Sequence, residues 1–425
     1  MARSLHPSLA AMRTRVLVVT GIYPWVGNPQ DAVFVRQQVR RLTQRGLDCQ
    51  VLAFRYCPPI VPASLWRLRY VRHLETADSG AGFPVHDVFV SRQLDRRGDV
   101  VPRIANALTD HIVRTPALRN MDVIYAHWLW PAGAAALHLR RRFGRPVAAI
   151  ARGSEMHHWQ AMHPCCRPYV ERVVREADCV LANCVALRDA AHALAPDTPR
   201  QIDVVYNGCD GEYFAPAEGR ADARRMLGLA ANDRAALFCG SMLERKGIRT
   251  LALAWQRFSA TAPEWQLIAI GRLVETPLVR QLARVPRVRI VGPVGHDDVR
   301  TFMQAADAYV QPSIHEGLSN ATMEAMATGL PVITTDTGGQ RELIAHDVNG
   351  LLIPVEDAGA LARALSLVAH DPARARQLGR RGREPVLSRF APDRQVAKLV
   401  ALLERTASAG RTAPPTAAAS RNVPA

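Results

Sequence analysis

Two glutamates in one glycine-containing segment are the residues best placed to do chemistry. In the segment Ser313–Gly339, Glu316 lies in a turn-prone stretch, and Glu324 follows eight positions later among helix-forming residues. Ser319 or Asn320 is suited to cap that helix, so its first free backbone amides would point back toward Glu316. Such amides bind anions, phosphate among them. Two carboxylates so placed can approach one ligand from different sides, as a sugar and a ribose attached to one diphosphate require.

Two adjacent cations form a second group of candidate residues. Arg245, Lys246 and Gly247 follow a predicted strand and the turn residue Gly240. A guanidinium binds phosphate oxygens through a planar fork, whereas an ammonium is a compact charge that can follow a departing oxygen. Lys246 and Lys398 are the only lysines among 54 basic residues, which favours a specific role for Lys246 in diphosphate departure. The alternative is an ordinary basic loop.

The elements that must position these residues alternate between short apolar runs and longer amphipathic segments. This pattern predicts an α/β protein with helices packed on mostly parallel sheets. The expected strands are Val16–Thr20, Gln50–Phe54, Val123–His127, Val147–Ala151, Cys179–Ala182, Asp203–Tyr206, Ala235–Cys239, Gln266–Ile270, Val288–Val291, Ala308–Gln311, Val332–Thr335 and Gly350–Ile353. The expected helices are Phe34–Arg45, Ala132–Phe143, Tyr169–Ala177, Thr250–Ala262, Val299–Ala305, Ala321–Thr328, Gly359–His370 and Pro392–Thr406.

Two doubly wound domains follow from this series. We expect an N-terminal Rossmann-like domain over residues 1–205 and a C-terminal one over 206–391, with the helix at about 392–406 packing back on the first. The proline-containing stretch Cys57–Val101 is expected to be irregular. The tail 407–425, rich in Ala, Pro, Thr, Ser and Arg, is predicted to be disordered.

Composition narrows the class of protein. With 425 residues, 48% apolar and 22% charged, the chain fits a folded globular protein and not a disordered one. It has no apolar stretch of about 20 residues, and Met1–Met12 lacks the apolar core of a secretory signal. Eight scattered cysteines fit reduced thiols. We therefore expect a cytoplasmic protein without a membrane span.

The net charge of +16 raises the question of an anionic partner, and +12 of it belongs to residues 1–200. An aromatic content of 6% argues against nucleic acid as the partner. Trp66–His73 and Arg140–Arg142 place cations and aromatics in this half. These residues could bind the anionic inner face of a membrane. Solvated helix faces are the alternative reading of the same residues.

The two glutamates in their full context resemble the motif of the retaining glycosyltransferases with the GT-B fold, of the family-four type. Glu316 stands in Glu-Gly-Leu-Ser and Glu324 in Glu-Ala-Met-Ala-Thr-Gly-Leu-Pro-Val. The resemblance implies two Rossmann-like domains facing across a cleft, with the transferred sugar at Glu316 and the ribose hydroxyls at Glu324. It implies that the diphosphate site consists of Gly240, Arg245, Lys246, Gly317, Leu318 and Ser319.

The N-terminal half resembles the same family over three loops. His127, at the carboxyl end of a predicted strand, matches a histidine that contacts the donor sugar near the reacting carbon. Gly27 and Asn28 stand in the opening loop, where the family usually has paired glycines. Arg152 opens a loop that faces the cleft, at a position where histidine is commoner, and this departure bears on the choice of acceptor. Without the resemblance, His127 alone would read as a structural histidine.

The implied reaction moves a sugar from a nucleoside-diphosphate-sugar to a hydroxyl, with retained anomeric configuration. The implied acceptor is a saccharide or a lipid-linked molecule, as in bacterial-type polysaccharide or glycolipid synthesis, and no cofactor or metal is expected. A nucleotide-sugar epimerase of the same fold is the main alternative, because it would use the donor without an acceptor. A nucleic-acid-binding protein is the other alternative.

Overall fold

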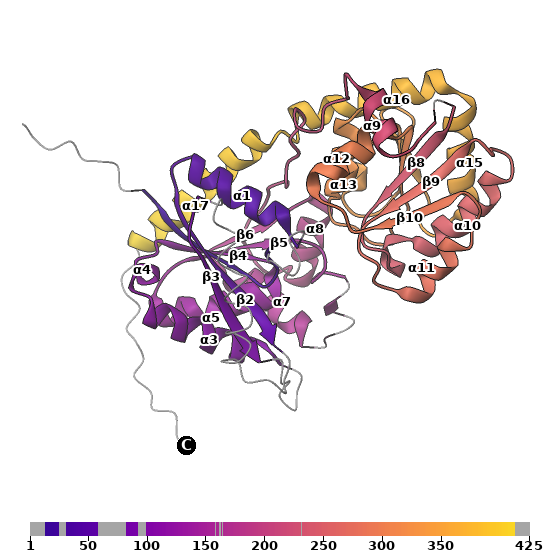
Figure 1. Cartoon of the computed structure of the whole chain (residues 1–425). Coiled ribbons are helices and arrows are strands. Elements are labelled where there is room, and N and C mark those ends of the chain that lie inside the picture. Colours follow the sequence, from indigo (N-terminus) through magenta and orange to yellow (C-terminus); the bar gives the residue numbers. More distant parts are fainter. Residues whose placement is uncertain are drawn as a thin grey trace, which may run out of the picture. The chain divides into compact units, whose positions relative to one another are not determined.

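A computed structural model describes residues 13–24, 31–57, 82–91, 99–157, 159–160, 163, 165–230 and 232–412. Within these residues the chain forms two compact units (Figure 1). The first unit comprises the chain up to Leu181, Ala191–Asp203 and the segment from Val396 onward. The second unit comprises Ala182–Ala190 and Val204–Gln395. Each unit is therefore built from segments that are distant in sequence.

The first unit contains a seven-stranded sheet in the order β3-β2-β1-β4-β5-β6-β7. Its strands are β1 (Arg15–Thr20), β2 (Asp48–Cys57), β3 (Val85–Ser91), β4 (Val123–His127), β5 (Val147–Ala151), β6 (Cys179–Ala182) and β7 (Ile202–Val204). Every residue of β4 and β5 is buried, as expected for central parallel strands covered on both faces. The strand order reverses between β1 and β4, whose pairing begins with Val16 opposite Val123.

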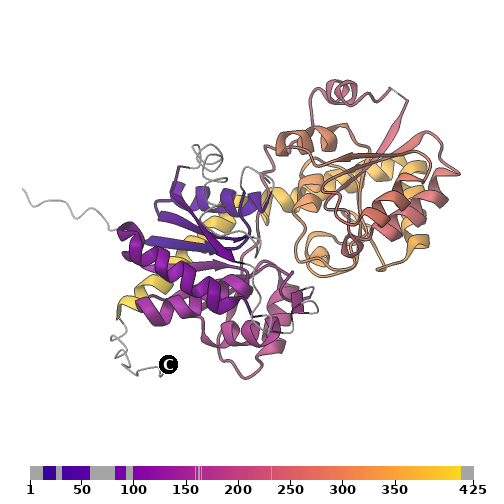
Figure 2. The same ribbon diagram turned by 60° about the horizontal axis from the view of Figure 1, so that its bottom comes forward.

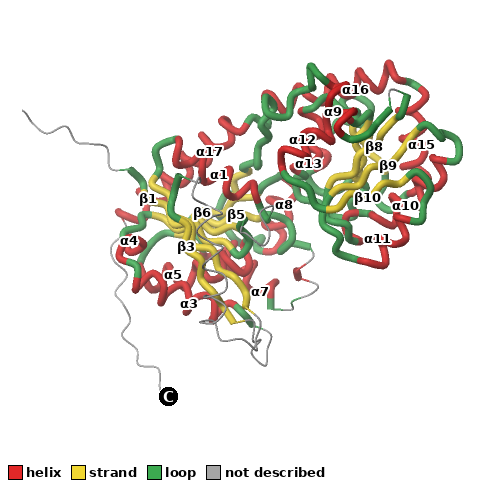
Figure 3. Tube along the Cα trace, viewed as in Figure 1, coloured by secondary structure: helices red, strands yellow, loops and turns green. Residues whose placement is uncertain are grey.

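Helices cover both faces of this sheet (Figure 3). They are α1 (Val33–Gln44), α3 (Val101–Arg114), α4 (Pro116–Arg119), α5 (Ala134–Phe143), α7 (Cys166–Glu176) and α8 (Val185–Leu194), with one π-helical turn η1 (Leu129–Gly133) before α5. α3 buries Ile104, Leu108 and Ile112 on one side and packs against α5. The 3.6-residue spacing of these apolar positions explains why this segment is helical.

The second unit contains a six-stranded sheet in the order β10-β9-β8-β11-β12-β13. Its strands are β8 (Arg234–Cys239), β9 (Trp265–Ile270), β10 (Val288–Gly292), β11 (Ala308–Gln311), β12 (Val332–Thr335) and β13 (Leu351–Ile353). The strand pairs β8–β9, β8–β11, β9–β10, β11–β12 and β12–β13 are all parallel. The order reverses between β8 and β11, so the carboxyl ends of these two strands form the position at which doubly wound sheets bind ligands.

The helices of the second unit complete its core. They are α9 (Arg220–Met226), α10 (Ile248–Ser259), α11 (Thr276–Ala283), α12 (His296–Ala305), α13 (Asn320–Ala327), α14 (Gln340–Leu343), α15 (Ala358–His370) and α16 (Pro372–Ser388), with one 3-10 turn η2 (Glu244–Lys246). α10 packs against α15 and α11, and Trp255 and Phe258 of α10 are buried in the main apolar cluster. Asp357 and Asp371 cap α15 and α16, each accepting a backbone N–H three residues later.

Helix α17 (Pro392–Thr412) carries the chain from the second unit back to the first (Figure 2). From Val396 onward it belongs to the first unit, where Lys398 forms an ion pair with Asp203 at 3.5 Å. Leu399, Leu403 and Ala407 are fully buried. The C-terminal helix therefore completes the N-terminal unit.

Most predicted elements are present, several with the predicted bounds. β4, β5, β6, β11 and β12 match residue for residue, and the α/β class with two Rossmann-like units is confirmed. Other strands and helices are displaced, lengthened or shortened by a few residues. Asp203–Tyr206 was placed too late, because the strand ends at Val204, and α5 begins at Ala134 because η1 precedes it.

Three expectations were wrong. The stretch expected to be irregular contains β3, which pairs with β2 along all seven of its residues. Seven helices of the described chain were not predicted: α3, α4, α8, α9, α11, α14 and α16. The tail expected from Ala407 is helical through Thr412, because Ala407 is buried and Gly410 lies against Pro146. Residues 413–425 lie outside the described part of the chain.

Candidate active site

The predicted residues of the second unit gather where its strand order reverses. Gly240 follows β8 and Lys246 lies in the turn η2 beyond it, whereas Glu316 follows β11. The backbone N–H of Ile314 donates to the carbonyl of Arg245 at 2.8 Å and so ties the two loops together. Gly240 donates to Ile270 at 3.0 Å, which extends the pairing of β8 with β9. The fold thus brings the cations and the first glutamate to one place.

Lys246 and Glu316 form a direct ion pair between Nζ and Oε2. Their side chains are 14% and 12% exposed, so the pair is mostly shielded from water. Burial acts to raise the pKa of the Glu316 carboxyl, but Lys246, with help from Arg245 and Ser313, outweighs it and holds the pKa below its usual value. The carboxylate of Glu316 is therefore ionised. It holds the ammonium of Lys246 in the candidate site.

Gln311 is a site residue that the sequence did not reveal. Its Nε2 donates to Glu316 Oε2 at 3.3 Å and to Ser313 Oγ at 3.2 Å. Its Oε1 accepts from the hydroxyls of Ser319 and Thr322 at 3.0 and 3.3 Å. A buried polar side chain on a central strand needs such partners, and this one links the Glu316 loop to the start of α13.

Two glycines allow the loops to approach closely. Gly247 has φ +72°, and a Cβ there would lie 1.8 Å from the carbonyl oxygen of Pro312. Gly338 has φ +52°, and its Cβ would lie 1.7 Å from the carbonyl oxygen of Glu316. No side chain fits either place, so both glycines are required for the position of the Glu316 loop.

Helix α13 presents its N-terminus beside the same loop. Ser319 is its N-cap and accepts the N–H of Thr322 at 3.2 Å, as one of the two sequence alternatives predicted. Within the described chain, the N–H groups of Gly317, Leu318 and Ser319 donate no hydrogen bond to the protein. Glu324 keeps partial exposure on α13, and burial raises the pKa of its carboxyl to about 7. Free N–H groups and a helix N-terminus together suit an anion.

His127 of the first unit ends β4 and is completely buried. Its Nδ1 lies 2.9 Å from Nη2 of Arg152, which follows β5. Burial first, and then the positive charge of Arg152, lowers the pKa of His127 well below its usual value. Two of the four residues that the family resemblance indicated in this half, His127 and Arg152, are therefore direct neighbours.

Glu155 anchors the loop that Arg152 opens. Its Oε1 accepts the backbone N–H of Arg152 at 2.8 Å and that of Leu129 at 3.2 Å, so one carboxyl joins the loop after β5 to the turn after β4. Burial raises the pKa of this carboxyl to about 7. The sequence alone did not indicate this role for Glu155.

For several other predicted residues the structure gives little or no support for a role in the site. Gly27, Asn28 and Trp66–His73 lie outside the described residues. In the Arg140–Arg142 run, Arg140 pairs with Asp178 at 3.0 Å and Arg141 with Glu176 at 2.9 Å, so two of the three charges are neutralised. Across the described ranges, no His, Cys, Asp and Glu side chains form a group able to hold a metal ion. No helix in those ranges has the length and apolar character to cross a bilayer.

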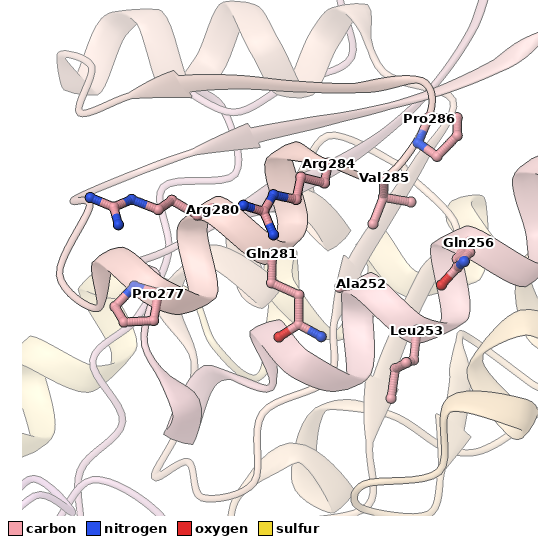
Figure 4. Close-up of a pocket in the computed structure, with 9 residues that line it drawn as sticks. All are labelled: Ala252, Leu253, Gln256, Pro277, Arg280, Gln281, Arg284, Val285 and Pro286. Carbon is pink, nitrogen blue, oxygen red and sulfur yellow. The ribbon is translucent and has the colours of Figure 1, made fainter.

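A surface pocket of the second unit is distinct from these residues. It has a volume of about 410 Å³ and lies between α10 and α11, as Figure 4 shows. Its lining includes Gln256 of α10, Arg280 and Gln281 of α11, and Arg284, which follows α11. None of the predicted site residues contributes to its lining, so it is not the candidate active site.

Comparison with known proteins agrees with this arrangement in both units. Residues 32–213 match the family described as Glycosyltransferase Family 4, and residues 233–371 match Glycosyl transferases group 1. A protein named as a teichuronic acid biosynthesis glycosyltransferase, TuaC of Bacillus subtilis (strain 168), is 28% identical over 366 residues. That match covers 84% of this chain and 90% of the relative.

Solved structures share the fold. Sucrose-phosphate synthase from Thermosynechococcus elongatus superimposes with a TM-score of 0.75 at 22% identity, covering 93% of this chain and all of that one. HepE from Anabaena, in complex with UDP and glucose, gives 0.72 at 19% identity, covering 92% of this chain and all of that one. These are GT-B folds, and both halves of the sequence match the family, so the chain belongs to the group 1 glycosyltransferases of the family-four type.

Proposed function

We propose that this glycosyltransferase moves a sugar from a nucleoside-diphosphate-sugar to a hydroxyl acceptor with retention of anomeric configuration. The main support for a donor site is that Arg245, Lys246 and the start of α13 lie together at the carboxyl ends of β8 and β11. Two cations and unpaired backbone N–H groups there match the charge of a diphosphate. A saccharide or lipid-linked acceptor fits the relative named for teichuronic acid biosynthesis.

The Lys246–Glu316 ion pair gives this proposal a physical sequence of events. When a diphosphate binds, its oxygens compete with Glu316 for the ammonium of Lys246. Glu316 is then released to accept hydrogen bonds from hydroxyls of the transferred sugar, while Glu324 accepts from the ribose. As the bond to the sugar breaks, negative charge grows on the leaving diphosphate, and Lys246 and Arg245 stabilise it.

His127 contributes from the first unit in this proposal. Its uncharged ring donates a hydrogen bond to the sugar near the reacting carbon, which orients the donor. The acceptor hydroxyl loses its proton to the departing phosphate, on the same face of the sugar that the leaving group vacates. Retention follows from attack on that face, and the cations make a bound metal unnecessary.

The test is a screen of nucleotide sugars by thermal shift, followed by transfer assays with the donors that raise the melting temperature. UDP-sugars come first, because the HepE structure holds UDP. We expect turnover in excess chelator and a product whose anomeric configuration, read by NMR, matches the donor. Inversion would exclude the mechanism, and isomerised donor released without acceptor would identify an epimerase instead.

A further inference from the structure

The contact between Arg152 and His127 determines which ring nitrogen carries the proton. Nη2 of Arg152 lies 2.9 Å from Nδ1 of His127. A guanidinium nitrogen can only donate, so Nδ1 must accept through its lone pair. The ring proton therefore resides on Nε2.

Arg152 is itself held by groups from several elements. Its Nη2 also donates to Gln38 Oε1 of α1 at 3.3 Å, and this oxygen accepts the Tyr125 hydroxyl of β4 at 3.0 Å. Its guanidinium carbon lies 5.0 Å from the centre of the Phe34 ring. The side chain is 8% exposed, so its direction is fixed by packing as well as by hydrogen bonds.

The other ring nitrogen of His127 is unused. Nε2 is buried and has no hydrogen-bond partner in the described structure. A buried N–H without an acceptor destabilises the folded protein, so such a group in a native structure calls for an explanation. A hydroxyl oxygen of a bound sugar would satisfy it.

We propose that Arg152 is a positioning residue for sugar transfer, which holds His127 as the uncharged Nε2–H tautomer so that this N–H is offered to an oxygen of the transferred sugar. The inference rests on the proposed function and extends it to a residue at which the chain departs from the family resemblance. Protonation at Nδ1 would set two N–H groups and two positive charges against each other. His127 thus serves as a hydrogen-bond donor and neither as an acid nor as a base.

The ionisable groups around the pair are few. Tyr125 lies on the same strand as His127, with ring centres 4.7 Å apart, and burial raises the pKa of its hydroxyl to about 12. Glu155 approaches from the loop after β5 and accepts the main-chain N–H of Arg152. From α1 the neighbour is the uncharged Gln38. Between about pH 5 and 8, Glu155 is therefore the one neighbour among these expected to change charge.

NMR of the full chain labelled with 15N-histidine tests the tautomer directly. The His127 signals are assigned by their loss in His127→Gln. In the wild type, Nδ1 should have the far-downfield shift of an unprotonated ring nitrogen and Nε2 that of a protonated one, unchanged from about pH 5 to 8. Arg152→Met should give mixed tautomers or a titrating ring, whereas Arg152→Lys, still a donor, should keep the proton on Nε2.

A matched control separates this effect from general loss of a buried arginine. Arg224 of the second unit is also 8% exposed, and it pairs with Asp307 at 3.2 Å. Arg224→Met should lower the melting temperature and leave the His127 signals at their wild-type positions. A proton on Nδ1 in the wild type, or an unaltered His127 spectrum in Arg152→Met, would overturn the proposal. If Arg152→Met does not fold, loss of the Nε2–H tautomer in Arg152→Lys would overturn it.

Kinetics with the identified donor add the functional half of the test. Arg152→Met should reduce kcat/KM about 10- to 100-fold, the loss seen when a group that orients a metal-bound histidine is removed. Arg152→Lys should keep a higher kcat/KM than Arg152→Met. Full activity of Arg152→Met would overturn the positioning role. If the wild type transfers no sugar while its spectrum shows the expected tautomer, the proposed function is wrong and the tautomer assignment stands.

Discussion

At the scale of single residues, the Lys246–Glu316 ion pair makes Lys246 the sharpest test of the donor site. Lys246→Ala should lower kcat more than tenfold, about 1.4 kcal/mol of barrier, because the ammonium gains most as charge builds on the diphosphate. Lys246→Arg should keep only part of the wild-type kcat, because the wider guanidinium cannot occupy the place of the compact ammonium beside Glu316. Steady-state kinetics with the screened donor measure both.

The other lysine of the chain supplies the control. Lys398, which lies on α17, forms its ion pair with Asp203 of β7 and is 45% exposed, so Lys398→Ala should leave kcat unchanged. Full turnover in Lys246→Ala would remove this residue from the mechanism. Full activity in Lys246→Arg would show that charge alone is needed.

Glu324 predicts a pH dependence of nucleotide binding. Its carboxyl has a pKa of about 7 because of burial, and ribose hydroxyls donate best to the ionised form. The ionised fraction increases as pH rises through 7, so affinity for a nucleoside diphosphate should increase up to about tenfold per pH unit below 7 and level off above it. Calorimetric titration at several pH values measures this. Glu324→Gln should bind more weakly above pH 7 and lose this dependence, and an unaltered slope in that variant would exclude Glu324 as its origin.

At the scale of elements, Gly247 connects backbone geometry to the cation site. Gly247→Ala puts a Cβ at positive φ and within 1.8 Å of the Pro312 carbonyl, so it should lower the free energy of unfolding by on the order of 3 kcal/mol and displace Lys246. Gly228 has a similar φ of +68° with open space around it, and Gly228→Ala should cost only about 1 kcal/mol. Urea denaturation compares the two. Equal losses of unfolding free energy in the two variants would show that the close approach of Gly247 to the Pro312 carbonyl is unimportant.

How far sequence predicts this structure depends on where the determining contacts lie. The central strand β5 is a continuous apolar run, and β4 and β11 are apolar up to their last residues, His127 and Gln311, so the apolar pattern alone reveals all three strands. Helix α16 contains Gly379, Gly382 and Pro385, which weaken helix propensity locally. Gly379 is nevertheless needed, because a Cβ there would lie 2.0 Å from the carbonyl of Gly329. A tertiary contact of this kind leaves no local pattern.

The candidate site divides in the same way. Glu316, Lys246 and His127 could be predicted because motif residues carry a recognisable local context. Gln311 could not, since a glutamine within an apolar strand looks like any tolerated polar residue until its partners are known. The Arg152–His127 contact also joins the ends of separate strands, and only their adjacency in the sheet places the two side chains together.

At the scale of the whole molecule, the excess positive charge of the N-terminal half predicts an attraction to anionic surfaces. Vesicles with anionic lipids should carry the protein in flotation experiments better than neutral vesicles, at roughly 1 kcal/mol per exposed basic residue near the surface. Added salt should weaken the effect. Equal flotation with both kinds of vesicle would leave no ground for a membrane-bound acceptor site. The ion pairs of Arg140 and Arg141 reduce the number of free charges, so the preference should be modest.

Helix α17 predicts which unit fails on truncation. A chain ending at Gln395 loses Leu399 and Leu403, each worth about 2 kcal/mol or more when fully buried, which is a large part of a domain's stability. Calorimetry should then show loss of the transition of the first unit and retention of that of the second. A chain ending at Thr412 keeps every described contact and should show both. Retention of both transitions in the shorter chain would exclude this role for α17.

The same helix affects how the protein is made. The ribosome produces the strands of the first unit early, but the helix that carries Leu399 and Leu403 comes only after the second unit, about 190 residues later. At about 5–20 residues per second, the N-terminal sheet waits roughly 10–40 s for its last helix. During that interval its apolar face is open to other nascent chains, so translation speed over the second unit sets the exposure of the first.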